Sequence, residues 1–290
     1  MKKLLIIFLT IILTLSFSAC GEKNITDNTD KNGKENNDNS SFTEIVVADN
    51  KNCSIIITGI DSDNSSGFTV QVELKNKSND KSYMVSIEDS FINGIDCLTD
   101  FALQIDAGKK YNADIILLSN QLKDNGVGDF TDIELTFFVF DLGNWDAGAV
   151  VLETVHIYPY GEDKASKYVR ETQPSDNVIV DNQYVKVIVI GYDPENENGY
   201  AVDLFLLNKT ASVAMFSVAD ASVNGHNINP YYTAYVSANG CAFSSIVWPD
   251  NILKEKGITD IEEIQLLLAA NTYENWQGDY YFKETFTLNP

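Results

Sequence analysis

The chain carries the same stretch twice, and this duplication constrains its fold more than any other feature. Residues 49–159 align with residues 181–290, with one single-residue gap in a loop. An alignment held over about 110 residues marks a duplicated domain, so we expect two tandem copies of one fold. Positions shared by the two copies include Asn50 with Asn182, Gly59 with Gly191, Gly67 with Gly199, Met84 with Met215, Gly126 with Gly257 and Trp145 with Trp276.

Each copy has the residue pattern of β-strands. Apolar and polar residues alternate over residues 68–74, which is the period of two expected of a strand with one buried face. The apolar run 83–92 ends at Asn93-Gly94, a dipeptide that readily takes the positive φ angles of a tight hairpin. About seven such runs in each copy, with turn signals every 8 to 12 residues, predict an immunoglobulin-like β-sandwich.

A short helix is predicted between late strands of each copy. Ser119 precedes a segment that ends at Gly126, and Pro249 opens residues 250–256 before Gly257. Proline favours the first turn of a helix, and glycine favours the position after its end. The predicted fold class is all-β, two tandem immunoglobulin-like sandwiches, because strands without long helices exclude a Rossmann or barrel enzyme core. The predicted domains are residues 43–159 (the first copy) and 177–290 (the second copy), joined by a linker at 160–176.

The start of the chain has the pattern of an export signal. Two lysines precede an apolar run over residues 4–17, and Ser18-Ala19-Cys20 follows it. This arrangement resembles the lipobox of bacterial lipoproteins, in which the cysteine accepts a diacylglycerol and becomes the new N-terminus. We expect residues 1–19 to be a lipoprotein signal peptide and Cys20 to carry the lipid. The alternative is an ordinary secretory signal that happens to end near a cysteine.

Residues 20–42 are predicted to be a disordered tether. The segment is rich in Asn, Asp, Lys, Glu and Ser, and Ile25 is the one large apolar residue between positions 21 and 41. Such a composition cannot bury enough apolar surface to fold. A random coil of this length reaches about 25 Å on average, enough to lift a domain off the lipid headgroups.

The charge of the chain limits its partners. There are 20 Lys and Arg residues against 42 Asp and Glu residues, a formal net charge of −22. A chain this acidic is repelled by nucleic acid and by anionic lipid surfaces unless a divalent metal intervenes. We therefore expect no nucleic-acid partner. The membrane link should run through the diacylglycerol on Cys20, which places the protein on the extracytoplasmic face of the cell membrane.

Three cysteines remain beyond Cys20, and none recurs in both copies. Cys53 and Cys97 are the one pair within a single copy, and Cys241 stands alone in the other. A disulfide that belongs to the fold would be expected in both copies. A Cys53–Cys97 bridge and three free thiols both stay open, and no two cysteines have the short spacing of a zinc site.

Catalytic motifs are missing from the sequence. His156 and His226 are the two histidines, and they align with Thr287 and Ile95, so neither belongs to a duplicated active site. The sequence contains no Gly-x-Ser-x-Gly, His-Glu-x-x-His or phosphate-binding glycine loop. We expect no enzymatic activity and no cofactor. The alternative is an extracytoplasmic hydrolase or wall-modifying enzyme with an unrecognised acidic site.

An acidic loop precedes the second strand of each copy and is a candidate Ca²⁺ site. It contains Asp61 and Asp63 in the first copy and Asp193, Glu195 and Glu197 in the second. Oxygen ligands at alternating positions suit Ca²⁺. The alternative is an ordinary solvated turn in an acidic protein.

Aromatic residues are enriched near the last hairpin of the second copy. The first copy has Leu142, Ala149 and Val150 at three of the equivalent positions, so the fold does not require these rings. Exposed aromatic faces stack on sugars or anchor a protein partner, although aromatic residues also simply cover strand surfaces. The candidate ligand-binding residues are Tyr231, Tyr232, Tyr273, Trp276, Tyr280 and Tyr281.

The chain resembles the uncharacterised tandem-repeat lipoproteins of low-GC Gram-positive bacteria. The resemblance is carried by the lipobox at Cys20, the Asn-rich tether, and the Asp-Asn start, Asn-Lys strand end and Asn-Gly turn of both copies. It implies a location and a fold with immunoglobulin-like domains, and it transfers no catalytic residue. The sequence thus predicts a lipid-anchored cell-surface binding or spacer module without catalytic activity, with a glycan or a protein as partner.

Overall fold

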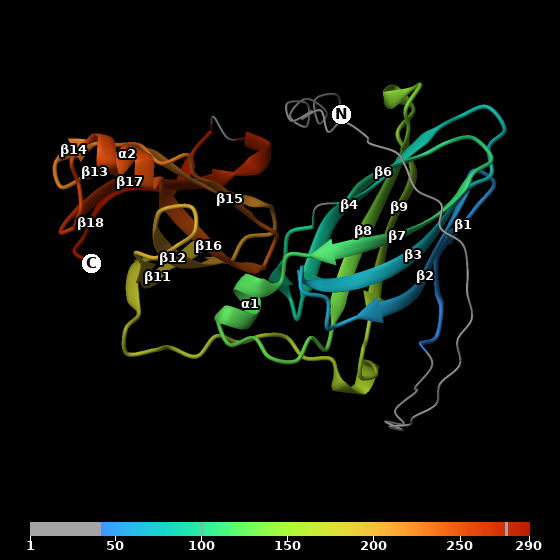
Figure 1. Ribbon diagram of the computed structural model, residues 1–290, viewed down its shortest axis with the longest axis horizontal. Coiled ribbons are helices and arrows are strands. Elements are labelled where there is room, and N and C mark those ends of the chain that lie inside the picture. Colours follow the sequence, from blue (N-terminus) through green and yellow to red (C-terminus); the bar gives the residue numbers. More distant parts are fainter. Residues whose placement is uncertain (1–41, 100, 276–277) are drawn as a thin grey trace, which may run out of the picture. The chain divides into compact units, whose positions relative to one another are not determined.

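The computed structural model describes residues 42–99, 101–275 and 278–290 (Figure 1). Phe42–Pro290 forms one compact unit. Strands make up most of its regular structure, and the described helices are short, which confirms the prediction of an all-β fold. Within the described residues, no helix is long and apolar enough to cross a membrane. The predicted signal peptide, Cys20, the tether up to residue 41 and Trp276 lie outside the described residues.

The two copies contain corresponding series of elements. Those of the first copy are β1 (Ile45–Asp49), β2 (Cys53–Asp61), β3 (Phe68–Asn76), β4 (Tyr83–Ile92), β5 (Ile95–Asp96), β6 (Ala102–Ile105), β7 (Lys110–Leu117), α1 (Asn120–Asp124), β8 (Ile133–Asp141), η1 (Trp145–Ala147) and β9 (Ala149–Ile157). The linker contains η2 (Glu162–Lys164). Those of the second copy are β10 (Asn177–Asp181), β11 (Val185–Asp193), β12 (Tyr200–Asn208), β13 (Ala214–Val223), β14 (His226–Asn227), β15 (Thr233–Val236), β16 (Cys241–Trp248), α2 (Asp250–Glu255), β17 (Ile264–Thr272), η3 (Tyr273–Asn275) and β18 (Tyr280–Leu288).

Strand pairing repeats between the copies. In the first copy β1-β2-β3-β7 form one set of neighbours and β4-β8-β9 another, with β6 also paired to β4. In the second copy β10-β11-β12-β16 and β13-β17-β18 pair in the same way, with β15 on β13. Figure 1 shows β2, β3 and β7 as one layer and β4, β8 and β9 as another. The predicted short helices α1 and α2 both follow the strand that completes the first set of each copy.

Alternating burial explains how the layers enclose a core. Along β8, Ile133, Leu135, Phe137 and Val139 are buried, and the residues between them are half-buried. Successive side chains of a strand point to opposite faces of its sheet, so one face of β8 belongs to the core and the other lies on the surface. Buried apolar residues gather into two clusters, one centred on each copy.

The repeated Asp-Asn and Asn-Lys motifs meet in space. In the second copy, Nζ of Lys209 donates to Asp181 Oδ1 and to the carbonyl of Asn182, each at 2.7 Å. Lys77 makes the equivalent bonds to Asp49 and to the carbonyl of Asn50. The motifs are therefore one structural device that ties the start of β2 or β11 to the end of the next strand.

A buried asparagine precedes each of these lysines, and its side-chain amide donates hydrogen bonds to nearby backbone carbonyls. Nδ2 of Asn208 donates to the carbonyls of Ser212, Val236 and Ser237 at 2.8–3.0 Å. Asn76 occupies the same position in the first copy and is also almost completely buried. Buried carbonyls need donors, which explains why Asn recurs at this position.

A glycine precedes the second long strand of each copy because the backbone of a neighbouring strand passes too close for a side chain there. Gly67 and Gly199 have φ angles of 135° and 128°. A Cβ on Gly67 would lie 2.1 Å from the carbonyl oxygen of Leu117, and one on Gly199 would lie 2.2 Å from that of Trp248. Both the dihedral angle and the distance exclude a side chain.

The β4–β5 hairpin of the first copy contacts the second copy. β5 pairs in parallel with β16, with Ile95 opposite Cys241, and so connects strands of the two copies in one sheet. The Asp96 carboxylate accepts hydrogen bonds from the backbone N–H and the Oγ of Ser237 at 3.2 and 2.6 Å. We call these contacts the junction.

The linker packs beside this junction. Arg170 and Asp176 form two hydrogen bonds of 2.6 Å, and the Arg170 guanidinium lies 5.5 Å from the centroid of the Phe205 ring. The ring of Tyr168 lies 6.0 Å from that of Phe243. The charged residues of the linker therefore make specific contacts in addition to connecting the copies.

The described cysteines Cys53, Cys97 and Cys241 are all free and buried. Of the two possibilities left open by the sequence, the structure has the free thiols.

Candidate binding surface

The predicted tyrosines of the second copy fall into different environments. Tyr231 is fully exposed, and Tyr280 is 46% exposed with Nζ of Lys283 lying 4.9 Å from its ring centroid. Tyr281 stacks on Tyr184 at a centroid distance of 5.0 Å. The sequence pattern therefore does not correspond to one continuous aromatic surface in the described residues.

Tyr232 differs from the others because it is part of the core. Its side chain is 8% exposed and its hydroxyl donates to Ser244 Oγ at 3.1 Å. Burial raises the pKa of this phenol, and the ring is covered by protein, so Tyr232 is not available to an external ligand.

Tyr235 and Tyr273 form a small exposed pair that the sequence pattern identified only in part. Their rings meet edge to face at 5.3 Å, and their exposed fractions are 51% and 38%. Burial raises the pKa of Tyr235, so its phenol is neutral at physiological pH. This pair is a possible small ligand surface.

The predicted calcium loops are turns closed by their own backbone. Asp61 Oδ1 accepts from the N–H of Asp63 at 2.9 Å, and Asp193 Oδ1 accepts from the N–H of Glu195 at 3.0 Å. Glu197 is exposed in the same loop. Among the residues that the structure describes, no group of three or more His, Cys, Asp or Glu side chains could hold a metal ion.

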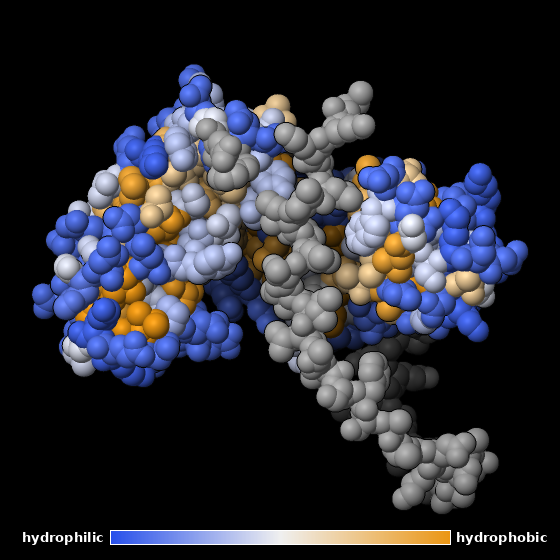
Figure 2. Space-filling model, turned by 90° about the horizontal axis from the view of Figure 1, so that it is seen from above, coloured by the Kyte–Doolittle hydropathy of each residue, from blue (hydrophilic) through white to orange (hydrophobic). Residues whose placement is uncertain are grey.

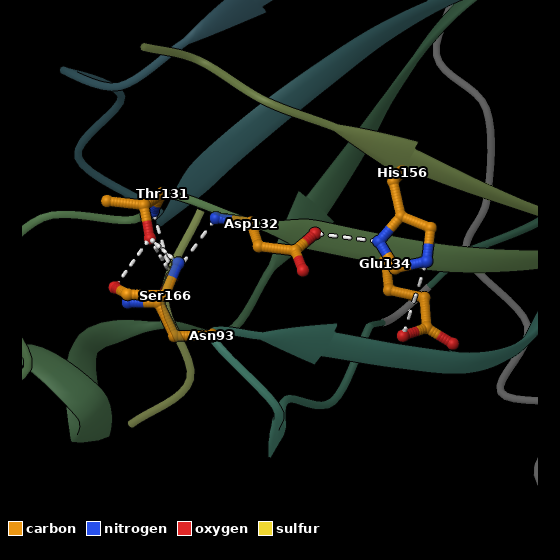
Figure 3. Close-up of polar contacts among 6 residues, drawn as sticks. All are labelled: Asn93, Thr131, Asp132, Glu134, His156 and Ser166. Carbon is orange, nitrogen blue, oxygen red and sulfur yellow. Dashed lines mark hydrogen bonds and ion pairs between the residues drawn. The ribbon is translucent and has the colours of Figure 1, made fainter. Parts of the chain in front are cut away.

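His156 lies between two carboxylates at the end of β8 and β9 (Figure 3). Its Nδ1 is 2.8 Å from Asp132 Oδ1, and its Nε2 is 3.8 Å from Glu134 Oε2. The hydroxyls of Thr131 and Ser166 lie 3.1 Å from each other, and Figure 3 shows them on the far side of Asp132 from His156. Nucleophilic catalysis needs the hydroxyl beside the histidine, whereas the contacts described here place two carboxylates beside it.

The outer face of β4, β6, β8 and β9 carries an apolar group that sequence reasoning missed. The rings of Phe138 and Phe140 lie 5.3 Å apart, and Phe140 lies 4.3 Å from Trp145. Leu152 is opposite Phe138 on β9, and Met84 is opposite Phe140 on β4. Trp145 is 49% exposed and Leu152 is 58% exposed. We call these five residues the apolar strip.

The second copy shows that the fold does not require three residues of this strip, although Met84 and Trp145 are matched there by Met215 and Trp276. The residues that replace Phe138 and Phe140 on β17 are Ala269 and Asn271, and Lys283 stands where the first copy has Leu152. The same strands therefore form with small and polar residues on this face. The signal in the sequence was that residues 137–140 are apolar on both faces, although an antiparallel sheet of this kind has one face in water.

The strip lies on a surface of one charge sign. Figure 2 shows hydrophobic residues as patches on an otherwise mainly hydrophilic surface. Strands β4, β6, β8 and β9 contain no Lys or Arg. Of their acidic residues, Asp89 and Glu134 share the face of the strip, whereas Asp141 and Glu153 lie opposite the buried Tyr83 and Phe137.

One of these carboxylates has its own partner. Asp141 is paired with Lys81 at 2.7 Å, and this hydrogen bond lowers the pKa of the Asp141 carboxyl. The cation of Lys81 is thereby occupied and does not neutralise the carboxylates on the face of the strip.

No protein-family model matches the chain, and no curated protein matches it. Among solved structures, it is similar to the YadV chaperone at 13% identity, with a TM-score of 0.22, covering 82% of this chain and 100% of that one. It is also similar to the CsuC–CsuE complex of Acinetobacter baumannii at 14% identity, with a TM-score of 0.22, covering 76% and 90%. A protein of unknown function from Porphyromonas gingivalis W83 matches at 11% identity and a TM-score of 0.22, covering 77% and 91%. Scores of this size do not establish a common fold, so function is argued from this chain's own residues.

Proposed function

We propose that this protein is a non-catalytic binding module that is lipid-anchored through Cys20 on the extracytoplasmic face of the cell membrane. In this proposal it consists of two tandem immunoglobulin-like sandwiches and binds a protein partner through the apolar strip. The observation that carries the proposal is the apolar strip itself: Trp145 and Leu152 are exposed, Phe138 and Phe140 are half-buried beside them, and the second copy has Ala269, Asn271 and Lys283 in place of Phe138, Phe140 and Leu152.

The sandwich assignment is supported by the repeated pairing of strands. In each copy two sets of antiparallel strands enclose one cluster of buried apolar residues. Short strands joined by tight turns around such a core are typical of immunoglobulin-like domains.

The geometry of the strip favours a protein over a sugar. The ring planes of Phe138 and Phe140 are inclined by 41°, and those of Phe140 and Trp145 by 35°. Stacking on a pyranose uses flat, aligned rings, whereas aromatic residues together with Met are enriched in the centre of protein interfaces. Leu152 and Met84 extend the strip with aliphatic surface, which adds to the area a protein side chain can cover.

The test exchanges the strip for the residues of the second copy. The variant Phe138→Ala/Phe140→Asn/Leu152→Lys carries side chains that the same strands already accommodate in the other copy. A photocrosslinking amino acid at position 154, adjacent to the strip on β9, is used on intact cells to capture the partner. We expect a discrete protein adduct that the exchange removes.

The matched control changes the exposed tyrosine pair with Tyr235→Ala/Tyr273→Ala and should leave the adduct unchanged. An adduct that survives the strip exchange, or no adduct at this position, contradicts binding through the strip. Cys20→Ala tests the anchor separately, because the unlipidated protein should appear in the medium and not in the membrane fraction.

A second candidate function is glycan binding by the second copy, favoured by the exposure of Tyr231, Tyr235 and Tyr273. Fragment 41–290 would be tested against a panel of wall polysaccharides. Binding that is lost in Tyr235→Ala/Tyr273→Ala and kept in the strip exchange would support this candidate over the first.

The alternative of an extracytoplasmic hydrolase places its chemistry at the acidic cluster around His156. Hydrolysis of wall material that disappears in Glu134→Gln and His156→Ala would support that alternative and contradict the non-catalytic proposal.

A further inference from the structure

The charged residues of the strip-bearing face are arranged by the strand register. Phe140 and Phe138 lie at one end of β8, Thr136 follows, and Glu134 comes at the other end. Thr136 and Thr154 hydrogen-bond across β8 and β9 at 2.9 Å, and they separate the apolar strip from the carboxylates. Six residues of strand span about 20 Å. The face therefore has an apolar end and an acidic end, separated by about the length of a short peptide segment.

Several carboxylates lie at or near the acidic end. Glu134 is opposite His156 on β9 and opposite Phe91 on β4. Figure 3 shows the carboxylates of Asp132 and Glu134 on either side of the His156 ring. Asp89 lies one row closer to the strip, opposite Thr136. The described strands of this face offer no Lys or Arg to these groups.

The turn before the edge strand adds a carboxylate beside the strip. Glu153 on β9 is exposed, but it lies opposite the buried Phe137 and so belongs to the other face of the sheet. Asp146 follows Trp145 in η1 and is also exposed. A ligand that covers the strip therefore meets negative charge along its border as well as at the far end.

We infer that the outer face of β4, β6, β8 and β9 binds a cationic amphipathic segment of a partner protein. The apolar side chains of that segment cover the strip, and its Lys or Arg side chains meet the carboxylates of Asp89 and Glu134. This inference rests on the proposed function and adds the chemistry of the partner.

The two parts of the surface contribute differently to binding. Burial of the aromatic and aliphatic side chains supplies most of the affinity, at roughly 25 cal/mol per Å² of apolar area. Exposed ion pairs add little each, but complementary charge raises the association rate and selects among partners. Because these carboxylates lie at the surface, their contribution should fall as salt is added.

The second copy provides an internal comparison for charge as well as for apolarity. Its corresponding strands β13, β15, β17 and β18 carry Asp220 and Glu284 together with Lys283. At the position of Glu134 it has Gln265. The one-signed face is therefore a property of the first copy and not of the fold.

The experiment uses fragment 41–290 and three synthetic peptides. The peptides share one apolar half with Trp, Leu and Phe, and their second halves carry three Lys, three Gln or three Glu residues. Fluorescence anisotropy measures each affinity at low and at high salt. We expect the Lys peptide to bind about tenfold more tightly than the Gln peptide at low salt, with the gap closing as the charges are screened.

The protein variants separate charge from apolar contact. Asp89→Asn/Glu134→Gln should weaken the Lys peptide by about threefold to tenfold and leave the Gln peptide unchanged. Asp220→Asn, at the position that matches Asp89 in the second copy, is the control and should change neither. The strip exchange Phe138→Ala/Phe140→Asn/Leu152→Lys should abolish binding of both peptides.

The outcomes distinguish this inference from the proposed function. If the Lys and Gln peptides bind equally and both depend on the strip, the cationic partner is overturned while binding through the strip stands. If the strip exchange leaves the affinity of the Lys peptide unchanged, the charges act elsewhere on this acidic protein and the inference is overturned. If the photocrosslinked adduct on cells also survives that exchange, the proposed function fails with it.

Discussion

In the hairpins β4–β5 and β13–β14, the two strands are joined by the same turn. The φ angles of Asn93 and Asn224 are 53° and 48°, and the glycine after each has a φ of 77°. Nδ2 of each asparagine donates to a backbone carbonyl at 2.7 Å, that of Asp129 in the first copy and that of Asp260 in the second. These bonds are local to one copy, so duplication reproduced the turn unchanged.

The residues that follow the two turns lie in different environments. Ile95 is fully buried opposite Cys241, and Asp96 accepts hydrogen bonds from Ser237. The equivalent residues His226 and Asn227 are exposed. The comparison teaches that the same hairpin becomes a packing element only where a second surface covers it.

That second surface is also specific to one copy. A Cβ on Gly240 would lie 3.1 Å from Asp96 Oδ2 and 3.1 Å from the carbonyl oxygen of Ser237. The first copy has Lys109 at the equivalent position. The lysine side chain at this position in the first copy would fill the space that Asp96 occupies beside Gly240. The first copy therefore cannot make the same contact, and the junction forms once per chain.

Introducing the first copy's residue at this position should have the largest effect. Gly240→Lys should lower the free energy of unfolding by about 3 kcal/mol, because the new side chain lies too close to Asp96 and displaces its carboxylate from Ser237. Burial raises the pKa of the Cys241 thiol to about 12, which keeps it unreactive toward thiol reagents. Opening of the junction should therefore accelerate its labelling.

The labelling is measured in a background with Cys53→Val and Cys97→Ile, which are the residues of the second copy at those positions. Lys109→Gly is the reciprocal control and should not change the labelling rate. Equal labelling of Cys241 with and without Gly240→Lys would show that the glycine is not needed for the contact.

Alanine substitutions at Ile95 and His226, the first residues of β5 and β14, should lower the free energy of unfolding by different amounts. Ile95→Ala should cost about 3 kcal/mol, because a fully buried aliphatic side chain is removed and a cavity remains. His226→Ala should change the free energy of unfolding by less than about 0.5 kcal/mol, because this side chain is exposed. Urea denaturation of the two variants tests the difference, and equal losses would show that Ile95 does not support the junction.

The junction should weaken as the pH rises. Burial raises the pKa of Asp96 to about 6 from 3.8, against the lowering effect of its hydrogen bonds with Ser237. The folded state therefore holds a proton that the unfolded chain has lost between these pH values. The associated stabilisation, roughly 2–3 kcal/mol, is complete below about pH 4 and is lost as the pH rises through 6.

This pH dependence is measured by denaturation between pH 4 and 7 against Asp96→Asn, which carries the second copy's residue. The other titratable groups that bear on Asp96 or are influenced by it are Asp89 on β4, Cys97 next to it and Cys241 on β16. Asn227→Asp, at the exposed equivalent position, should leave the pH profile unchanged. Parallel profiles for the wild-type chain and Asp96→Asn would contradict the assignment.

Alanine substitutions at the two turn asparagines, Asn93 and Asn224, should differ less in the free energy of unfolding that they cost. Asn93 is 6% exposed, so Asn93→Ala leaves buried backbone groups without a partner and should cost about 2 kcal/mol. Asn224 is exposed, water can replace its bonds, and Asn224→Ala should cost about 1 kcal/mol. A larger loss for Asn224→Ala in urea denaturation would contradict this ranking.

The smallest effect is expected where the second copy already holds the replacement residues on the equivalent strands. The strip exchange Phe138→Ala/Phe140→Asn/Leu152→Lys should change the free energy of unfolding by less than about 1 kcal/mol, because the same strands hold those residues in the second copy. A much larger loss would mean that the strip contributes to the core and is not a binding surface.

Much of the fold was predictable because it depends on short-range patterns. The period of two over residues 68–74 identified β3, and Asn93-Gly94 identified the turn between β4 and β5. Gly126 and Gly257 have φ angles of 77° and 72° just beyond α1 and α2. These properties follow from the dihedral preferences of a few neighbouring residues.

The candidate site was less predictable because exposure depends on what lies opposite. Tyr231 and Tyr232 are adjacent in the sequence, yet the first is fully exposed and the second is buried with its hydroxyl bonded to Ser244. Conversely, the residue pattern around Phe138 and Phe140 resembles a strand buried on both faces, and the structure leaves one of its faces at the surface.

The sequence by itself determined that this chain contains two copies of one all-β unit, because duplication and strand periodicity are properties of residue order alone. Only the tertiary structure decided that Ile95 is buried and Asp96 half-buried while His226 and Asn227 are exposed. It also decided that the apolar strip belongs to the first copy's outer face. The physical reason is that burial, unlike a turn or a strand, is set by surfaces that distant parts of the chain bring together.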